Sequence, residues 1–231
     1  MKKISKLTVI TTLITLLPIV LGIALYDRLP EVVATHWNIH NRPDGWSSRA
    51  MAVFGMPGIL ALVNLVCSIA MEIYPDSPFV KVRPVSIKAV GGWEKENKLA
   101  DKVSPRLMWL CRWIIPVLSL ILVPVMLYSA MGVSFDMGRI VCSILGIMFI
   151  IIGNYLPKCR RNGVVGIKIP WTLSSDENWD KTHRFAGFVW IVCGAAAIVG
   201  GWTKPVVAIV ALVAMILLPV VYSGILKHKG I

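Results

Sequence analysis

Six stretches of this 231-residue chain are apolar over about 20 residues each, and they limit the possible folds more than any other feature. A helix rises about 1.5 Å per residue, so a run of this length crosses the roughly 30 Å hydrocarbon core of a bilayer. We therefore predict membrane-spanning helices at 7–26, 51–74, 107–131, 140–156, 185–202 and 205–226.

The composition excludes the soluble alternatives. Hydrophobic residues make up 56% of the chain and charged residues 16%, whereas an ordinary globular protein has about 25% charged residues. Too few charged groups remain to cover a water-facing surface, and a disordered chain would be much less hydrophobic. The predicted fold class is all-α, a polytopic integral membrane bundle of six transmembrane helices.

The distribution of positive charge predicts that both termini are cytoplasmic. Of the 24 lysine and arginine residues, 18 lie in the two terminal tails and in the second and fourth connections, and five lie on the opposite side. Loops rich in lysine and arginine remain in the cytoplasm. The net charge of +12 is therefore explained by topology, and we expect no direct binding of nucleic acid.

We expect three parts along the chain. Residues 1–74 form an N-terminal two-helix membrane unit with an outer loop at 27–50, residues 75–106 form a cytoplasmic connection, and residues 107–231 form a four-helix membrane unit with a cytoplasmic loop at 157–184. The first span also resembles a signal peptide, but its apolar run exceeds the usual 7 to 15 residues. We predict that it is retained.

The spans themselves carry little chemistry. Their charged residues are Glu72 and Arg112, which lie near cytoplasmic ends and can reach the interface by snorkelling. Asn64 is expected to form a hydrogen bond between helices. Small residues in the fifth span predict close packing against the sixth, which follows after a two-residue connection; they are Cys193, Ala197 and Gly201.

The outer segment at 27–49 is locally neutral and is predicted to fold compactly around a turn at Pro43-Asp44-Gly45. His36 and His40 would share a helical face, but no third ligand accompanies them, so we predict no metal site. Trp37 and Trp46 are interpreted either as anchors at the headgroup level or as part of a binding surface.

In the fourth connection, Pro170 predicts an extended Ile169, and Ser174 with Glu177 forms the pattern of a capping box that begins a helix. Trp171 and Trp179 are expected at the water boundary. No nucleophile, base and orienting group fall close together, so we predict neither an enzyme nor a cofactor. The basic residues of this segment would face anionic lipids; they are Arg160, Arg161 and Lys168.

The two polar segments resemble the SdpI-type membrane immunity proteins of bacteria. The outer segment is similar to the N-terminal membrane domain of unknown function that accompanies this family, on the residues Leu29-Pro30, Thr35-His36-Trp37-Asn38, Pro43-Asp44-Gly45 and Ser48-Arg49. Asn41 stands where glycine is commoner, and asparagine tolerates the left-handed conformation that a turn needs.

The fourth connection resembles the second signature of the family. The matching residues are Asn154, Pro157-Lys158, Asn162, Gly166-Ile167-Lys168, Pro170-Trp171-Thr172, Trp179 and Thr182-His183-Arg184. Lys168 replaces the more usual arginine, which keeps the charge but loses bidentate geometry.

The resemblance implies a multi-pass protein of the bacterial cell membrane that protects its producer from a secreted antimicrobial peptide toxin. It also implies, in some members, recruitment of a cytoplasmic ArsR-like repressor once toxin is bound. The resulting candidates for toxin binding on the outer side are Pro30, His36, Trp37, Asn38, Asp44, Gly45 and Trp46. The candidates in the cytoplasmic signature loop are Asn162, Gly166, Lys168, Pro170, Trp171, Thr172, Trp179, His183 and Arg184, with Arg160 and Arg161 as a basic patch for signalling.

Two other functions remain open from the residues alone. Six spans are compatible with a transporter or exporter of small molecules or peptides, although ionisable residues at depth, which ion-coupled transporters use, are scarce. An intramembrane enzyme would have to use His36 or His183, which lie on opposite sides of the membrane in this topology and so cannot share a site.

Overall fold

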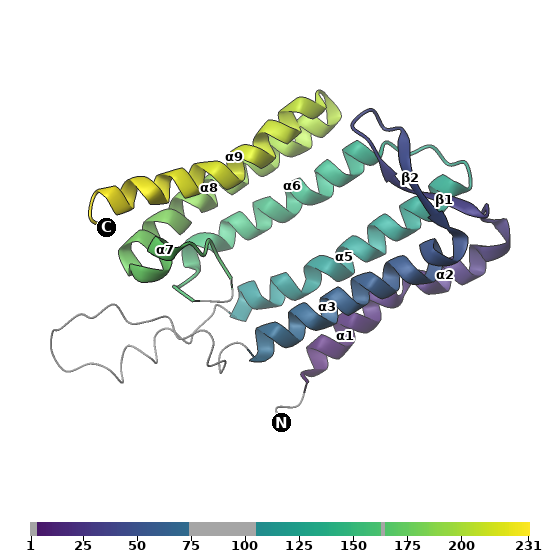
Figure 1. Cartoon of the computed structure of the whole chain (residues 1–231), viewed down its shortest axis with the longest axis horizontal. Helices are drawn as coiled ribbons and strands as arrows, with labels where there is room; N and C mark the ends of the chain where they lie inside the picture. The colour runs from purple at the N-terminus through teal and green to yellow at the C-terminus, as the bar shows by residue number, and fades with distance from the viewer. Residues whose placement is uncertain (1–3, 74–104, 163–164) are drawn as a thin grey trace. The chain divides into compact units, whose positions relative to one another are not determined.

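Long apolar helices dominate the computed structural model of the chain, which describes residues 4–73, 105–162 and 165–231 (Figure 1). Within these residues, six helices are long and apolar enough to cross a membrane: Lys6–Arg28, Met51–Glu72, Met108–Ala130, Met137–Lys158, Asp176–Trp202 and Pro205–His228. The all-α polytopic fold is confirmed. The side of the membrane on which the termini lie stays a prediction, and the connection at 75–106 lies outside the described residues except for its last two.

The contacts divide the chain into two compact units, which we call unit 1 and unit 2. Unit 1 comprises Met1–Glu72 and Cys111–Val141, and unit 2 comprises Ile73–Leu110 and Cys142–Ile231. The first half of the chain contains helices α1 (Lys6–Leu16), α2 (Pro18–Leu25), α3 (Met56–Ile73) and the strands β1 (Val32–Trp37) and β2 (Pro43–Ser48). The second half contains α5 (Pro105–Ala130), α6 (Met137–Tyr155), α7 (Pro170–Ser174), α8 (Asp176–Trp202) and α9 (Pro205–His228).

The first span is two helices because Pro18 lacks a backbone N–H and clashes with the preceding turn. Ser5 begins α1, and its hydroxyl accepts a hydrogen bond from the Thr8 N–H at 3.2 Å. The second span opens with a π-helical stretch at Met51–Gly55 that leads into α3. Between the two spans lies an antiparallel β-hairpin, which the sequence analysis did not anticipate.

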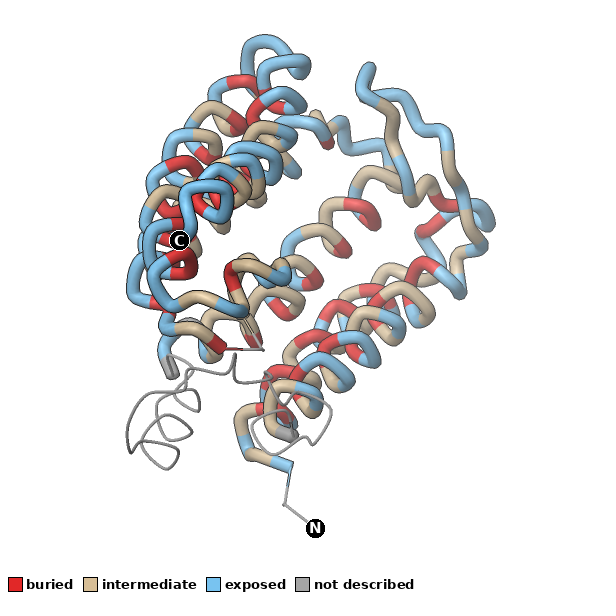
Figure 2. Tube along the Cα trace, turned by 60° about the vertical axis from the view of Figure 1, so that its left-hand side comes forward, coloured by how far each residue is buried: buried red, intermediate tan, exposed pale blue. Residues whose placement is uncertain are grey.

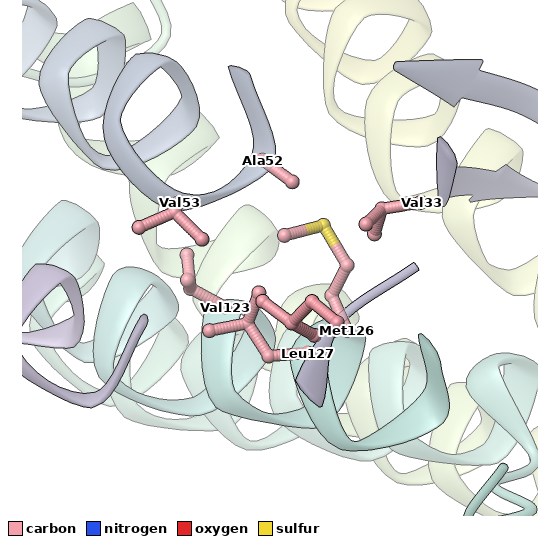
Figure 3. Packing of buried hydrophobic residues seen from close by; sticks show 7 residues of the cluster. Val33, Ala52, Val53, Val123, Met126 and Leu127 are labelled. Atoms are coloured by element: carbon pink, nitrogen blue, oxygen red, sulfur yellow. The ribbon is translucent and has the colours of Figure 1, made fainter. Parts of the chain in front are cut away.

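The apolar core of unit 1 fixes this hairpin to the ends of the helices. Its buried members come from the end of the first span, the hairpin, the second span and α5 (Figure 3); they are Leu29, Val33, Ala52, Val53, Val123, Met126 and Leu127. Val33 and Val53 are fully buried. Gly22 admits Val53, because a Cβ on Gly22 would lie 2.6 Å from the Val53 Cγ1.

A polar seam runs between the three membrane helices of unit 1. It consists of the buried Thr8, Thr11 and Thr15 on the first span, Asn64, Ser68 and Glu72 on α3, and Arg112 and Ser119 on α5. Asn64 is 1% exposed and its amide lies 3.2 Å from the hydroxyls of both Thr11 and Thr12. The predicted hydrogen bond between helices is confirmed.

Glu72 and Arg112 do not snorkel separately to the interface, as the sequence suggested. Arg112 Nη1 lies 3.2 Å from Glu72 Oε1, and the same carboxylate oxygen accepts hydrogen bonds from the Ser5 and Thr8 hydroxyls at 2.5 Å. The Arg112 residue is only 7% exposed. A charge buried in lipid is costly unless it is paired, and the pairing explains why both residues lie inside the unit.

In unit 2, α8 and α9 form the tight antiparallel pair that the two-residue connection predicted. A Cβ on Gly200 would lie 2.5 Å from the Ala208 backbone nitrogen, so glycine permits the close approach. Small buried residues continue this contact; they are Ala197, Ala208 and Ala211. Small side chains at a helix contact let backbones approach within membranes.

Two glycine pairs bring α6 equally close to α8. A Cβ on Gly146 would meet the Gly194 carbonyl oxygen at 2.5 Å, and a Cβ on Gly153 would meet the Gly187 carbonyl oxygen at 2.9 Å. The two glycines on each helix are seven residues apart, which is about two turns. This contact between α6 and α8 was not predicted from the sequence.

Many large apolar residues along the helices of both units are exposed. Figure 2 shows exposed positions recurring along the helices. Val20 and Phe188 are each 67% exposed and Ile216 is 64% exposed. Apolar surface this extensive is rare on soluble monomers. It is the expected surface of spans that contact lipid.

Candidate functional site

The outer hairpin is one of two ordered polar structures that contain the sequence candidates. Its register pairs Val33 with Ser47 and Ala34 with Trp46, with irregularities beside His36. Pro43-Asp44-Gly45 lies within β2, so the predicted turn at these residues is wrong. The chain reverses through Asn38–Arg42, where Asn41 has a φ of 58°. Asparagine tolerates this left-handed backbone, as the sequence analysis expected.

Side chains of the hairpin tie it to neighbouring segments of unit 1. Asn41 Oδ1 accepts from the Met137 N–H at 2.9 Å, and Asn41 Nδ2 donates to the Phe135 carbonyl at 3.0 Å. This amide therefore satisfies the first free N–H of α6. Arg49 Nη1 donates to the Tyr26 carbonyl at 2.9 Å and its guanidinium lies 4.7 Å from the Tyr26 ring centroid.

The outer candidates separate into structural and exposed residues. Trp37 packs partly against the core of unit 1, and Asn38 Oδ1 accepts from two backbone N–H groups of the turn at 2.9 and 3.1 Å. Gly45 is needed beside His36, because a Cβ there would lie 2.9 Å from the His36 Cβ. These three residues shape the hairpin.

The remaining outer candidates face solvent. Trp46 is 60% exposed, Pro30 is exposed, and His36 Nδ1 lies 2.5 Å from Asp44 Oδ1 in an exposed pair. His36 lies in β1, so it does not share a helical face with His40. Within residues 4–73, 105–162 and 165–231, no three histidine, cysteine or carboxylate side chains are arranged to hold a metal ion.

The second polar structure, which we call the signature cluster, joins the loop after α6 to the start of α8. At its centre the rings of Trp179 and His183 stack with centroids 3.9 Å apart, and both residues are fully buried. Trp179 Nε1 donates to the Cys159 carbonyl at 2.7 Å. Trp179 is therefore a core residue of unit 2, and its predicted place at the water boundary is wrong.

The hydrogen bonds of His183 fix a neutral ring. Nε2 accepts from the Ile167 N–H at 3.0 Å, and Nδ1 lies 2.8 Å from the Trp179 carbonyl oxygen, to which it donates. Both nitrogens are therefore occupied, with the hydrogen assigned to Nδ1 from its partners. A ring engaged in this way holds the loop in place and has no nitrogen available for acid–base chemistry.

Gly166 is required where the loop crosses the ring pair. Its φ is +128°, which side chains rarely adopt, and a Cβ would lie 2.6 Å from His183 Nε2 and 2.8 Å from a ring carbon of Trp179. The glycine of the family signature thus allows the backbone to lie against the aromatic stack.

Two more signature residues hold the loop to α7. Thr172 Oγ1 donates to the Ile167 carbonyl at 2.7 Å and accepts from the Ile169 N–H at 3.1 Å. Asn162 Oδ1 accepts from the Val165 N–H at 2.8 Å. Ile169 is extended, with φ −119° and ψ 157°, as the sequence predicted, and Pro170 begins the short helix α7, which was not predicted.

The cap of α8 differs from the expected one. Ser175 is the N-cap, and its hydroxyl accepts from the Asn178 N–H at 3.1 Å. The predicted box of Ser174 with Glu177 is wrong, since Glu177 instead pairs with Lys181 at 2.7 Å one turn later. The first turn of α8 nevertheless carries acidic residues, which suit a helix N-terminus.

The basic candidates have different environments. Arg161 Nε lies 2.5 Å from Asp176 Oδ1 and Nη1 donates to the Leu173 carbonyl at 2.6 Å, so this residue fastens α7. Arg160, Lys168 and Arg184 are exposed. Trp171 lies beneath Lys227, whose Nζ is 4.8 Å from the ring centroid.

A hydrogen-bonded group around Asn178 was missed by sequence reasoning. Asn178 is fully buried; its Nδ2 donates to the Ser223 carbonyl and to the backbone oxygen of Ile231, each at 3.1 Å. Its Oδ1 accepts from the hydroxyls of Thr182 and Ser223. An asparagine one residue before a signature tryptophan was the only available signal.

The fold and these two structures define a class: the chain is a multi-pass membrane protein with two ordered polar structures beside its spans. Both structures lie in segments that match known protein families. Residues 158–223 match the SdpI/YfhL protein family, and residues 13–61 match the domain of unknown function DUF1648. The signature cluster and the outer hairpin lie within these two matches.

The chain is also similar along nearly its whole length to the immunity protein SdpI of Bacillus subtilis (strain 168). The identity is 24% over 223 residues, which cover 96% of this chain and 95% of that protein. No solved structure matches the chain. The resemblance to SdpI-type membrane proteins that the motifs indicated is confirmed.

Proposed function

We propose that the chain is a membrane immunity protein that protects its producer from a secreted antimicrobial peptide toxin. The observation that carries this proposal is the similarity to the immunity protein SdpI over 96% of the chain. The folding of both motif segments into ordered structures supports it, because a degenerate relative would not need to keep Gly166 in its positive-φ conformation.

Deletion of the gene from the producing strain tests protection even when the toxin is unidentified. Culture supernatant of the parent strain should inhibit growth of the deletion strain, and expression of this chain from a plasmid should restore resistance. Equal resistance of the deletion and parent strains would refute the proposed function.

The outer hairpin is the proposed docking site for the toxin. Trp46 and Val32 are each 60% exposed and Ile39 at the turn is 66% exposed, and they belong to the same hairpin as the exposed His36–Asp44 pair. A peptide that acts on membranes is amphipathic, so it can contact both kinds of group. Aromatic side chains contribute strongly to such interfaces.

Replacement of Trp46 by alanine should lower resistance while leaving the amount of protein in the membrane unchanged. Trp202→Ala is a matched control, because Trp202 is also 60% exposed but lies at the end of α8 outside the hairpin. Equal resistance of the Trp46→Ala variant and the parent would show that the toxin does not dock there.

Signalling through an ArsR-like repressor is the finer part of the proposal. The exposed Arg160 could contact an acidic surface of that partner, whereas Arg161 is engaged by Asp176 and the Leu173 carbonyl. Arg160→Gln should therefore reduce toxin-dependent expression of a reporter and spare resistance. Arg161→Gln should lower both, because it releases α7. Unchanged signalling in Arg160→Gln would contradict this contact.

A further inference from the structure

The polar seam of unit 1 contains two buried groups that its hydrogen bonds do not explain. Ser68 is 1% exposed and Arg112 is 7% exposed. Neither Ser68 Oγ nor Arg112 Nε has a hydrogen-bond partner within the described residues. Within a membrane, a buried polar group without a hydrogen-bond partner is destabilising, because lipid supplies no partner.

The neighbours of these two groups place them at the same level of the unit. Asn64, Ser68 and Glu72 occupy successive turns on one face of α3. When the Asn64 amide oxygen accepts from the Thr11 and Thr12 hydroxyls, its nitrogen lies 3.3 Å from the Arg112 carbonyl oxygen. The guanidinium of the same arginine reaches Glu72, with Nη1 3.2 Å from Oε1.

The Arg112 side chain therefore runs from the level of Asn64 to the level of Glu72, past the turn that carries Ser68. Arg112 thus contacts the residue one turn before Ser68 on α3 and the residue one turn after it, and Nε lies between the two contacting parts of Arg112, the backbone and Nη1. The Nε–H group is a donor only, and the hydroxyl can both donate and accept. A ligand between them must accept a hydrogen bond from Arg112 Nε, and it must either donate a hydrogen bond to the Ser68 hydroxyl or accept one from it.

Charge balance selects the ligand. Glu72 already neutralises Arg112, and its carboxylate also accepts hydrogen bonds from the Ser5 and Thr8 hydroxyls. An added anion or cation would leave an unpaired charge within the membrane-spanning helices. The ligand must be small, neutral and able to donate and accept, which describes water, and a buried water needs two to four polar partners.

We propose that unit 1 binds a water molecule between α3 and α5, within the membrane-spanning region, that accepts from Arg112 Nε and bridges to Ser68 Oγ. The water completes the coordination of the Glu72–Arg112 pair. This site is independent of the immunity function, since it requires only the contacts within unit 1.

Water-edited solid-state NMR on protein labelled with [13C,15N]arginine in phosphatidylcholine bilayers tests the site. Labelling with carbonyl-13C cysteine in a Cys159→Ser chain identifies Arg112 and leaves Cys111 and Arg112 unchanged, because Cys111-Arg112 and Cys159-Arg160 are the only Cys-Arg pairs in the sequence. We expect magnetisation from water to reach Arg112 Nε as readily as it reaches Arg49, which is partly exposed.

Substitutions then test whether the transfer of magnetisation from water to Arg112 Nε depends on the Ser68 hydroxyl or on general hydration of the protein. Ser68→Ala should slow the transfer to Arg112 Nε severalfold, and Ser68→Thr, which keeps a hydroxyl, should retain it. Cys67→Ala is the control, since Cys67 is the exposed neighbour on the same helix. Absence of transfer to Arg112 in the parent protein, with transfer to Arg49 present, would overturn the proposal. So would an Arg112 signal that Ser68→Ala leaves unchanged.

Discussion

Substitution of Gly166 by alanine tests whether the signature cluster is held together as the structure indicates. At a φ of +128° an alanine is strained by about 1–3 kcal/mol. Its Cβ would also lie 2.6 Å from His183 Nε2, so the ring must move and the Ile167 N–H bond is lost, which costs about 0.5–1.5 kcal/mol more. We expect the loop to lose about 2–4 kcal/mol of local stability.

Hydrogen exchange measures this loss directly. Each 1.4 kcal/mol changes an equilibrium tenfold, so exchange of the Ile167 amide should accelerate by about 30- to 1,000-fold, up to the rate of an open loop. Mass spectrometry of the peptide that spans 165–175, with the protein in detergent or nanodiscs, gives the rate.

A matched glycine variant separates the backbone strain of a positive φ from the steric clash of the added Cβ with the aromatic rings. Gly132 also has a positive φ, +92°, but a Cβ at this position would have no neighbouring atom within 4 Å among the described residues. Gly132→Ala should therefore destabilise its own turn and leave exchange at 165–175 unchanged. Unaltered exchange of Ile167 in Gly166→Ala would refute the account of the cluster.

Three further outcomes follow from other contacts. Gly153→Leu should force α6 from α8 and cost about 1–3 kcal/mol, seen as a lower thermal midpoint, while Gly224→Ala, with no neighbour within 4 Å, should not. Asn41→Gly keeps the left-handed turn but loses the hydrogen bonds to Met137 and Phe135. Loss of a cap costs about 1 kcal/mol, so amide hydrogen exchange at 135–140 should rise about fivefold. An unchanged exchange rate would show that the Asn41 amide does not hold the start of α6. Glu72→Ala should cost about 3–5 kcal/mol by leaving Arg112 buried without its partner, and the double variant with Arg112→Met should recover part of the loss; no recovery would mean that the two residues act separately.

The helices could be predicted from the sequence because the length and hydropathy of a span are local properties. Pro18 and the small residues around Gly200 also have local meaning, and their effects on the first span and on the α8–α9 pair were foreseeable. The hairpin could not be predicted in the same way. The outer segment has few residues that favour a strand, and residues that equally favour a turn lie between them.

Contacts between distant residues account for most of the errors. Glu72 and Arg112 are 40 positions apart with a long polar connection between them, and nothing in either segment signals the pair. Trp179 has the pattern of an interfacial anchor, and its burial depends on distant contacts, among them the hydrogen bond from its Nε1 to the Cys159 carbonyl. The glycines of α6 and α8 did carry a signal, since 146 and 153 match 187 and 194 at a spacing of seven.

The roles proposed for the two polar structures depend on their lying on opposite sides of the membrane. Single cysteines introduced into a cysteine-free chain, at exposed positions Ile39 in the hairpin and Ser174 in α7, can be labelled in intact cells with a membrane-impermeant maleimide. We predict that Ile39→Cys is labelled in intact cells and that Ser174→Cys is labelled only after permeabilisation. Labelling of Ser174→Cys from outside, or protection of Ile39→Cys, would contradict the proposed orientation.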